Sequence, residues 1–517
     1  MHDSPTLALP APSVRLWLGF SAMCLGMFMA VLDIQIVATS LPDIQSGLGM
    51  RQEDMSWIQT AYLIAEVIAI SLTGWLTRLL GLRNLCLAAI GGFTLASLGC
   101  ALSTGFASLI ACRIVQGLTG GCLIPMVFSA VFLIFPFRLQ GLATTIAGTL
   151  AVFAPTIGPL VGGWITDTYT WHWLFLINLA PGVLALTIIA TCLPGRIGTE
   201  QPLQKLDWIA LALIAATLAS LEIGLKRAPD HGWLSLQPLL LFLIAISCGS
   251  LFIYRTWLAD NRIVDLHLLA DRQFAIGCAL SFILGFGLYG SVYLMPVFLS
   301  LVRLHTAFEI GQIMLVSGLS QLLVAPVAVA LERRLDARLL SAIGFAVFAI
   351  GLGLSYTATW ETDFNGMFWP QAIRGGAIMF CLLPPTRLAL NHLPAGCVPD
   401  ASALFNLLRN LGGAIGLALI DTVIWGRAPM HVQHFVTRLL AGDADAARLV
   451  GLPTDRFLGK PLTVPDEATQ ELVRPLVERA GLVAAINDAW AMLGLLTLIG
   501  VVLILFLMKR RKAGAAT

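Results

Sequence analysis

The stretch LWLGFSAMCLGMFMAVLDIQIVATS, residues 16–40, decides the fold class of this protein. It contains one charged residue, Asp33, and it exceeds the about 20 mainly apolar residues that a helix needs to cross the hydrocarbon core of a bilayer. The stretch lies close to the N-terminus, but no small-residue cleavage site follows it, which indicates a retained span and not a cleaved signal. The sequence therefore begins with a predicted membrane-spanning helix.

The composition of the whole chain agrees with a lipid environment. Of its 517 residues, 58% are hydrophobic and 12% are charged, whereas a soluble domain carries roughly 25% charged residues. Such a chain cannot solvate its own surface, so the lipid bilayer is its expected partner. The net charge of +2 and the absence of a basic patch give no indication of nucleic-acid binding.

Similar apolar stretches recur along the chain, and we expect an all-α integral membrane protein with about fourteen transmembrane helices. An even number of spans places both termini on one side of the membrane. Lys and Arg concentrate in the segments on the side of the termini, which the positive-inside rule assigns to the cytoplasm. The predicted spans are 16–40, 56–78, 84–103, 106–133, 140–166, 173–194, 207–226, 233–257, 273–300, 309–330, 338–358, 364–390, 401–426 and 484–508.

A short internal echo suggests two related halves. GLTGGCLIP at 117–125 and GAIMFCLLP at 376–384 share the spacing of Gly, Cys and Pro, and parallel six-helix halves are a common plan in transporters. The predicted division is an N-terminal six-helix bundle at 1–195, two additional helices at 196–260, and a C-terminal six-helix bundle at 261–517. The C-terminal bundle includes a long periplasmic loop at about 427–483. This loop could be an external cap, a docking surface or a disordered connector.

Ionisable residues inside predicted spans are the first candidates for function, because burying them in lipid is costly. With a rise of about 1.5 Å per residue, Asp33 and Arg113 lie about 10 Å from the outer surface and Glu66 about 15 Å. A carboxyl group in an apolar cavity changes its protonation when a guanidinium moves toward or away from it. These residues are our candidates for proton coupling, and a purely structural buried ion pair is the alternative.

Two more arginines, Arg374 and Arg409, lie well inside predicted spans and are candidates for substrate binding or coupling. Glu222 and Asp421 lie nearer the outer ends, where we expect them to be interfacial. The arginines would favour an anionic ligand and the acids a cationic one, so the sequence leaves the charge of the substrate open.

The fifth span carries a second signal, GTLAVFAPTIGPLVGG at 148–163. Proline within a helix removes a backbone hydrogen bond and bends the helix, and small residues at intervals allow close helix packing. We therefore expect a bent, closely packed helix at a contact between moving parts. The residues that carry this motif are Pro155, Gly158, Pro159, Gly162 and Gly163.

Several motifs resemble signatures of the major facilitator superfamily, and within it those of the fourteen-span drug:proton antiporters. They occur in order on the predicted spans. LDIQIVATSLPDI is similar to L-D-x-T-x-x-N-x-A-L-P through Asp33, Leu41 and Pro42, with Gln35 in place of the usual Thr. GWLTRLLGLR is similar to G-x-L-A-D-R-x-G-R-K through Gly74, Gly81 and Arg83, with Arg78 in place of the acid. CRIVQGLTGG matches R-x-x-Q-G through Arg113, Gln116 and Gly117.

Two further motifs extend the resemblance. APTIGPLVGG is similar to the antiporter motif G-P-x-x-G-G through Gly158, Pro159, Gly162 and Gly163, and WHWLFLINLAPG is similar to W-R-W-x-F-x-I-N-x-P-x-G. The chain is also similar to the inner-membrane pumps of tripartite multidrug efflux systems, which work with a periplasmic adaptor and an outer-membrane channel.

The resemblance implies two six-helix bundles plus two extra helices, and proton-coupled efflux of small amphipathic compounds by alternating access. It also implies a multi-pass location in the bacterial inner membrane. In this family the arginine at the position of Arg113 takes part in proton transfer. Gln35 is a further candidate for substrate binding or coupling, because it lies beside Asp33 in its motif.

Other function classes stay open to different degrees. An exporter of one metabolite, such as a siderophore or an organic acid, fits the same residues, and a membrane sensor or scaffold would tolerate neutralisation of Asp33. An enzyme is not expected, because the histidines are dispersed, the cysteines form no paired motif and no phosphate-binding loop occurs. We therefore expect no metal and no cofactor, and a proton gradient as the energy source.

Overall fold

The computed structural model describes residues 13–50, 57–195, 207–258, 264–332, 334–457 and 466–509, and within these ranges all regular secondary structure is helical. The first helices are α1 (Val14–Thr39), α2 (Leu41–Leu48), α3 (Trp57–Ala101), α4 (Phe106–Gly120), α5 (Leu123–Ile134), α6 (Phe137–Thr168), α7 (Trp173–Leu176) and α8 (Leu179–Cys192). Then follow α9 (Trp208–His231) and α10 (Leu236–Leu258). The remaining helices are α11 (Arg272–Leu301), α12 (Ala307–Glu332), α13 (Ala337–Leu354), α14 (Phe364–Leu390), α15 (Val398–Leu440), α16 (Ala444–Val450) and α17 (Glu467–Lys509).

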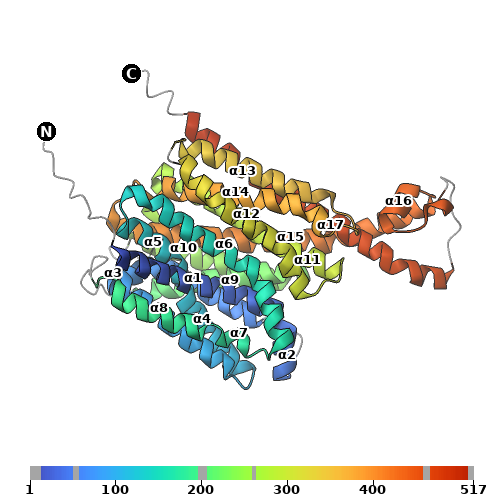
Figure 1. Cartoon of the computed structure of the whole chain (residues 1–517). Helices are drawn as coiled ribbons and strands as arrows, with labels where there is room; N and C mark the ends of the chain where they lie inside the picture. The colour runs from blue at the N-terminus through green and yellow to red at the C-terminus, as the bar shows by residue number, and fades with distance from the viewer. Residues whose placement is uncertain are drawn as a thin grey trace.

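The helices form one elongated bundle whose two ends differ (Figure 1). Helix α1 begins and α17 ends at the same end, which we call the terminal end. At the opposite end, α15 and α17 run on beyond the other helices and carry α16, and we call this the hairpin end.

The all-helical membrane fold predicted from the sequence is confirmed, but the number of fourteen spans is not. Twelve helices of the described residues are long and apolar enough to cross a membrane. One reason is that α3 is a single helix of 45 residues that covers two predicted spans. A straight helix of this length would extend about 68 Å, about twice the hydrocarbon core. The helical conformation is interrupted at Gly81, where φ is 72° and ψ is 155°, so the chain turns there.

Helix α14 is the second reason for the lower number. It occupies the predicted span 364–390 but is not among the twelve apolar helices. Three prolines lie within it, Pro370, Pro384 and Pro385, together with Arg374 and Arg387. These residues lower its apolar character although it is a continuous helix of 27 residues.

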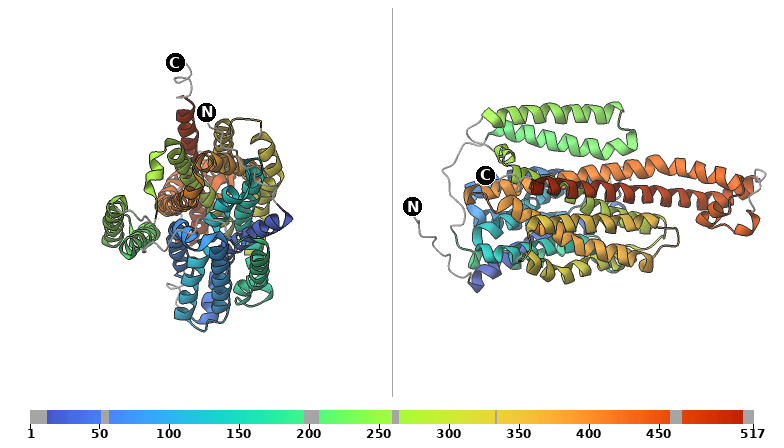
Figure 2. Two further views of the ribbon diagram at one scale, coloured as in Figure 1. Left: turned by 90° about the vertical axis from the view of Figure 1, so that its left-hand side faces the viewer. Right: turned by 90° about the horizontal axis from the view of Figure 1, so that it is seen from above.

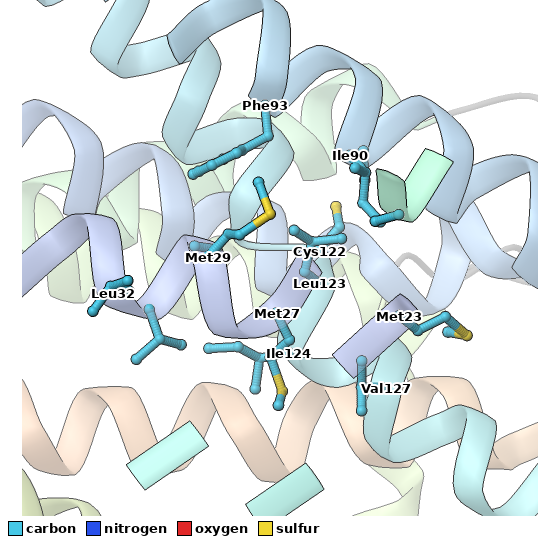
Figure 3. Packing of buried hydrophobic residues seen from close by; sticks show 14 of the residues in the cluster. Met23, Met27, Met29, Leu32, Ile90, Phe93, Cys122, Leu123, Ile124 and Val127 are labelled. Carbon is cyan, nitrogen blue, oxygen red and sulfur yellow. The ribbon is translucent and has the colours of Figure 1, made fainter. Parts of the chain in front are cut away.

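Two separate hydrophobic cores occupy the two parts of the bundle. One contains buried residues between Phe20 and Leu193, and the other contains buried residues between Leu280 and Ile504. In the first core, methionines of α1 pack against Leu123 and Val127 of α5 and lie near Phe93 of α3 (Figure 3). We refer to α1–α8 as the N-terminal half and to α11–α17 as the C-terminal half; the domain boundaries at 195 and 261 stay predictions.

The halves contact each other along two seams. Helix α6 packs against α12 and α14, and Thr149 Oγ1 lies 3.5 Å from Met379 Sδ across this seam. Helix α15 packs against α3 and α5, and Ser402 Oγ donates a hydrogen bond of 2.9 Å to the carbonyl oxygen of Pro125. Both seams are formed by long helices, so a relative rotation of the halves would have to change them.

The segment at about 427–483, predicted as a periplasmic loop of open form, is mainly helical in its described residues. Helices α15 and α17 are each 43 residues long and extend into it from both sides. Phe435 and Leu439 of α15 form a small core with Val477 of α17 and with residues of α16. Of the prolines in this segment, Pro475 lies inside α17, whereas 458–465 lies outside the described residues.

Helices α9 and α10 form a pair at the side of the bundle (Figure 2). Helix α9 contacts α3 and α15, whereas α10 packs mainly on α9. Only 17% of the most apolar part of α10 is buried. Its exposed apolar side chains suit contact with lipid.

Candidate functional site

The centre of the candidate site is an ion pair that is fully buried in the N-terminal half. Arg113 of α4 and Asp33 of α1 are both 0% exposed, and Arg113 Nη1 lies 2.5 Å from Asp33 Oδ2. Charged groups are tolerated in such surroundings when they are paired and hydrogen-bonded. The structure thus brings together two of the three residues that the sequence analysis proposed for proton coupling.

Three neutral side chains complete what we call the Asp33 network: Asp33, Ser97, Arg113, Gln116 and Asn178. Asp33 Oδ1 accepts hydrogen bonds from Gln116 Nε2 (3.0 Å) and Asn178 Nδ2 (2.8 Å). Gln116 also donates to Ser97 Oγ (2.8 Å) and accepts from Arg113 Nη1 (2.7 Å). Helix α4 and the turn before α8 therefore meet at the carboxylate of α1, and Ser97 of α3 joins the network through Gln116 and Asn178.

Local helix geometry explains part of this arrangement. Arg113 and Gln116 are three residues apart on α4, so they project from one face of that helix. Sequence reasoning named both from one motif, but it did not propose Ser97 or Asn178 as site residues. Asn178 lies in the motif WHWLFLINLAPG and could have been proposed as a site residue from it. Ser97 lies in none of the motifs, and a hydroxyl residue in an apolar helix is too common to indicate a site.

Aromatic rings and backbone groups enclose the guanidinium of Arg113. Its Cζ lies 4.3 Å from the ring centroid of Tyr62 and 5.9 Å from that of Phe175. Its Nε donates to the carbonyl oxygen of Ile58 (3.1 Å), while Nη2 is buried with no acceptor among the described residues. Arg113 is thus held at two of its three nitrogens and has a spare donor.

Glu66 does not belong to the Asp33 network. It lies on α3 and is 3% exposed, one helical turn after Tyr62 and within electrostatic range of Arg113. No described cation lies within ion-pair distance of it. The structure therefore places Glu66 near the ion pair, with Arg113 acting on both carboxyl groups.

Glycines of the fourth-span motif allow α4 to approach α3 beside these acids. A Cβ at Gly117 would overlap the backbone carbonyl of Tyr62, and one at Gly121 would overlap the backbone of Glu66. The R-x-x-Q-G motif thus combines polar groups for the network with a small residue for close packing.

The second-loop motif lies at the terminal end of the bundle, around the turn of α3. Gly81 is the turn of α3, and Arg83 Nη2 donates to the carbonyl oxygen of Ala190 (2.5 Å). Gly74 packs against Asp400 of α15, and Arg78 forms an ion pair with the same residue. Arg78, in the position where the related motif has an acid, thus connects the two halves.

The fifth-span motif lies on α6, between α1 and α12. Pro155 and Pro159 are both inside this helix. A Cβ at Gly158 would overlap Gln35 of α1, which is partly buried beside Asp33. The carbonyl oxygens of Gly162 and Gly163 accept from the hydroxyl of Thr166, at 3.1 and 3.2 Å.

The two arginines of the C-terminal half are buried but lie in different places. Arg374 is 3% exposed, its Cζ lies 5.3 Å from the ring centroid of Trp490, and its Nη1 has no acceptor among the described residues. Arg409 donates to Asn406, and its Cζ lies 5.5 Å from the ring of Phe128 in α5. Only Arg409 thus contacts the other half of the protein.

A cavity of about 150 Å³ lies within the C-terminal half and is lined by Met295, Phe298, Met367 and Trp490, among others. It is separate from the Asp33 network, so it does not mark the candidate coupling site. The described residues contain no group of three or more His, Cys, Asp or Glu side chains that could hold a metal ion.

Comparison with known proteins identifies the family. The family model of the Major Facilitator Superfamily matches residues 23–417. The colistin resistance protein EmrB of Acinetobacter baumannii is 36% identical over 424 residues, which cover 82% of this chain and 83% of the relative. The multidrug export protein EmrB of Escherichia coli is 32% identical over 425 residues, with coverage of 82% and 83%.

A solved structure supports the fold independently. The human organic anion transporter MFSD10 superimposes with a TM-score of 0.60 and 14% sequence identity, covering 95% of this chain and 99% of that one. The resemblance inferred from the motifs is confirmed, and the chain belongs to the major facilitator superfamily.

Proposed function

We propose that this protein exports small amphipathic compounds across the bacterial inner membrane in exchange for protons, by alternating access. The observation that carries the proposal is the Asp33 network, a buried carboxylate held by a cation and two amides in the half that contains the exporter motifs. The names of the bacterial relatives, a multidrug export protein and a colistin resistance protein, support export of this substrate class.

Proton binding at Asp33 would force the network to rearrange. The ionised carboxylate accepts hydrogen bonds from Arg113, Gln116 and Asn178. A protonated carboxyl group carries a donor on one oxygen and attracts a guanidinium less strongly. At least one of these partners would then move. Arg113 and Gln116 lie on α4, whereas Asn178 lies in the turn before α8. The protonation state is thereby linked to helix packing.

Contacts between the halves at the terminal end fit one state of an alternating cycle. Arg78 of α3 pairs with Asp400 of α15, and Arg387 of α14 lies over the ring of Phe137 in α6 at 4.9 Å. Both contacts hold the terminal end closed. If the termini are cytoplasmic, as the positive-inside rule indicates, this state is closed toward the cytoplasm.

The remaining parts of the proposal concern energy source and partners. The proton gradient would drive export without any cofactor and without catalysis of a covalent reaction. The hairpin of α15, α16 and α17 would face the periplasm in this orientation, where a periplasmic adaptor and an outer-membrane channel would act. Residues 1–12 and 510–517 lie outside the described residues.

Accumulation of a fluorescent dye in efflux-deficient cells tests the proposal. Cells that produce this protein should accumulate less dye, and an uncoupler should abolish the difference. Asp33→Asn should also abolish it while the protein remains in the membrane. Unchanged accumulation across a broad panel of dyes and drugs would contradict multidrug export, and activity that survives the uncoupler would contradict proton coupling.

A further inference from the structure

Helix α9, outside the two halves, carries Glu222 within its apolar sequence and Lys226 one helical turn later. The sequence analysis expected Glu222 to be interfacial. In the structure it is partly buried and lies within electrostatic range of Glu66 on α3. Ionisable groups inside a span are costly and usually face the protein interior, which raises the question of what this pair does.

The face of α9 that carries Glu222 packs against α3. Ile214 and Leu218 of α9 belong to the same hydrophobic cluster as Val67 and Ile70 of α3. Residues four apart lie on one face of a helix, so Glu222 continues the stripe formed by Ile214 and Leu218. This stripe faces the part of α3 that bears Glu66.

A direct hydrogen bond sets the register of the two helices. Lys226 Nζ donates to Thr60 Oγ1, one helical turn beyond Glu222 on α9 and near the start of α3. With a rise of about 1.5 Å per residue, Glu222 lies about 6 Å from Lys226 along α9, and Glu66 lies about 9 Å from Thr60 along α3. Because the helices run in opposite directions, the two carboxyl groups come to similar depth.

The charged and titratable groups around Glu66 come from several helices. Glu222 of α9 and Arg113 of α4 act on it, and Lys226 acts on Glu222. Tyr62 on the same helix and Tyr289 of α11 also lie within its electrostatic range. Glu222 is the one acidic neighbour among these groups of the described residues. Two carboxylates close together in an apolar setting do not both ionise readily.

We propose that α9 completes a proton-binding site in which Glu66 and Glu222 share one proton, while Lys226 and Thr60 hold α9 in register. The pair α9–α10 is then part of the coupling machinery and not a passive connection between the halves. This inference rests on the proposed proton-coupled export and identifies a second place, beside Asp33, where the proton binds.

Labelling with a hydrophobic carbodiimide tests the site in the full-length protein reconstituted in liposomes. The reagent reacts with protonated buried carboxyl groups, and mass spectrometry of the peptide that contains Glu66 gives the labelled fraction. At a fixed, near-neutral pH, Glu222→Gln should lower the labelling of Glu66 by about three- to tenfold, because the loss of an acidic neighbour favours the ionised form. Lys226→Met should raise it, because a cation that favours ionisation of the pair is lost.

Two further variants make the result specific. Glu309→Gln, which removes an acid at the exposed start of α12, should leave the labelling of Glu66 unchanged. Glu66→Gln should transfer the label to Glu222 if the two share a proton. Glu222→Asp keeps the carboxyl group and serves in place of Glu222→Gln if that variant does not fold; it should retain more labelling of Glu66 than a variant without an acid.

Equal labelling of Glu66 in the unmodified protein, Glu222→Gln and Lys226→Met would overturn the proposal. So would a change in the same direction for Glu222→Gln and Lys226→Met, since a merely structural role predicts a common loss of stability. The assay does not require transport. Opposite shifts in labelling combined with uncoupler-insensitive export would therefore refute the proposed function and leave the shared-proton site intact.

Discussion

The two halves of the molecule treat buried arginines differently. In the N-terminal half, Arg113 faces the carboxylate of Asp33 at 2.5 Å. In the C-terminal half, Arg374 lies over Trp490 and Arg409 donates to Asn406, and neither has an acidic partner among the described residues. The fully buried arginine of the N-terminal half thus has a carboxylate partner, whereas Arg374 and Arg409 have none in the described part of the chain; the arginine–carboxylate pair of the C-terminal half, Arg387 with Glu332, lies elsewhere on α14 and α12.

This contrast assigns different tasks to the halves. A guanidinium stays protonated at all physiological pH values, so Arg374 and Arg409 cannot carry the transported proton. They can attract an anionic group or interact with aromatic rings. The N-terminal half combines a carboxyl group with a cation and is suited to proton binding. The predictions below test this division, beginning with the largest expected effect.

Removing the cation of the buried pair should have the largest effect. Arg113→Gln leaves the carboxylate of Asp33 buried without its counter-charge, and we expect a loss of about 3–5 kcal/mol in the free energy of unfolding. Unfolding of the detergent-solubilised protein measures this. The double variant Asp33→Asn, Arg113→Gln should be more stable than the single one. If Arg374→Gln destabilises the protein as strongly as Arg113→Gln, the contrast between the halves is wrong.

Close packing of α4 on α3 should be the next most sensitive feature. Gly117→Ala places a Cβ against the carbonyl of Tyr62, and we expect a cost of about 1–3 kcal/mol from overpacking. The matched control is Gly353→Ala in α13 of the C-terminal half, where a Cβ would meet nothing within 4 Å. Thermal unfolding measures the stability of both variants. Equal stability would show that α4 can shift away from α3 to accommodate the added Cβ, and would contradict the prediction.

Neutralising the arginine at the seam should alter substrate affinity and leave proton coupling in place. We expect Arg409→Gln to raise the KM for an anionic amphipathic substrate about tenfold, which corresponds to about 1.4 kcal/mol. The KM for a cationic dye should not rise, and the pH dependence of export should stay the same. Transport assays in proteoliposomes measure both. A changed pH profile would place Arg409 in the coupling machinery.

The partly exposed ion pair between Asp207 and Arg255 should contribute least to the stability of the protein. It serves as a comparison for the buried pair of Asp33 and Arg113. Asp207 precedes α9, and the hydrogen bond from Arg255 lowers the pKa of its carboxyl group. The stabilisation is present above the usual pKa of Asp, about 3.9, and is lost as the pH falls through the lowered folded value. Asp207→Asn should cost less than about 1 kcal/mol and should flatten this acid dependence of unfolding.

Much of the fold could be predicted because it depends on local composition. Long apolar stretches determine helices in lipid regardless of their neighbours, and the ordered motifs indicated the family correctly. The predicted number of fourteen spans was not confirmed. Two predicted spans form the single helix α3 with a turn at Gly81, and α14, with its prolines and arginines, is not among the twelve apolar helices. The helical form of the segment 427–483 could not be predicted from the sequence, because the pairing of Phe435 and Leu439 with Val477 is a tertiary contact between residues far apart in the chain.

In the candidate site, too, some residues could be predicted from local sequence and others only from tertiary contacts. Asp33, Glu66 and Arg113 stood out in the sequence, since charge in an apolar stretch is a local anomaly, but their partners did not. Ser97 and Asn178 are ordinary polar residues until the fold places Asn178 against Asp33 and Ser97 against Gln116 and Asn178. The function of Asp33, Glu66 and Arg113 in proton coupling stays a prediction.

By itself, the sequence determined that this protein is a helical membrane protein of the major facilitator superfamily with buried charges in its N-terminal half. Only the tertiary structure decided which groups meet: Arg113 pairs with Asp33, and α9, which carries Glu222, packs on the part of α3 that bears Glu66. The physical reason is that these interactions depend differently on the positions of distant residues. Hydrophobicity acts on each stretch of chain independently, whereas ion pairs and hydrogen bonds require positions accurate to fractions of an ångström, which only the packing of distant helices provides.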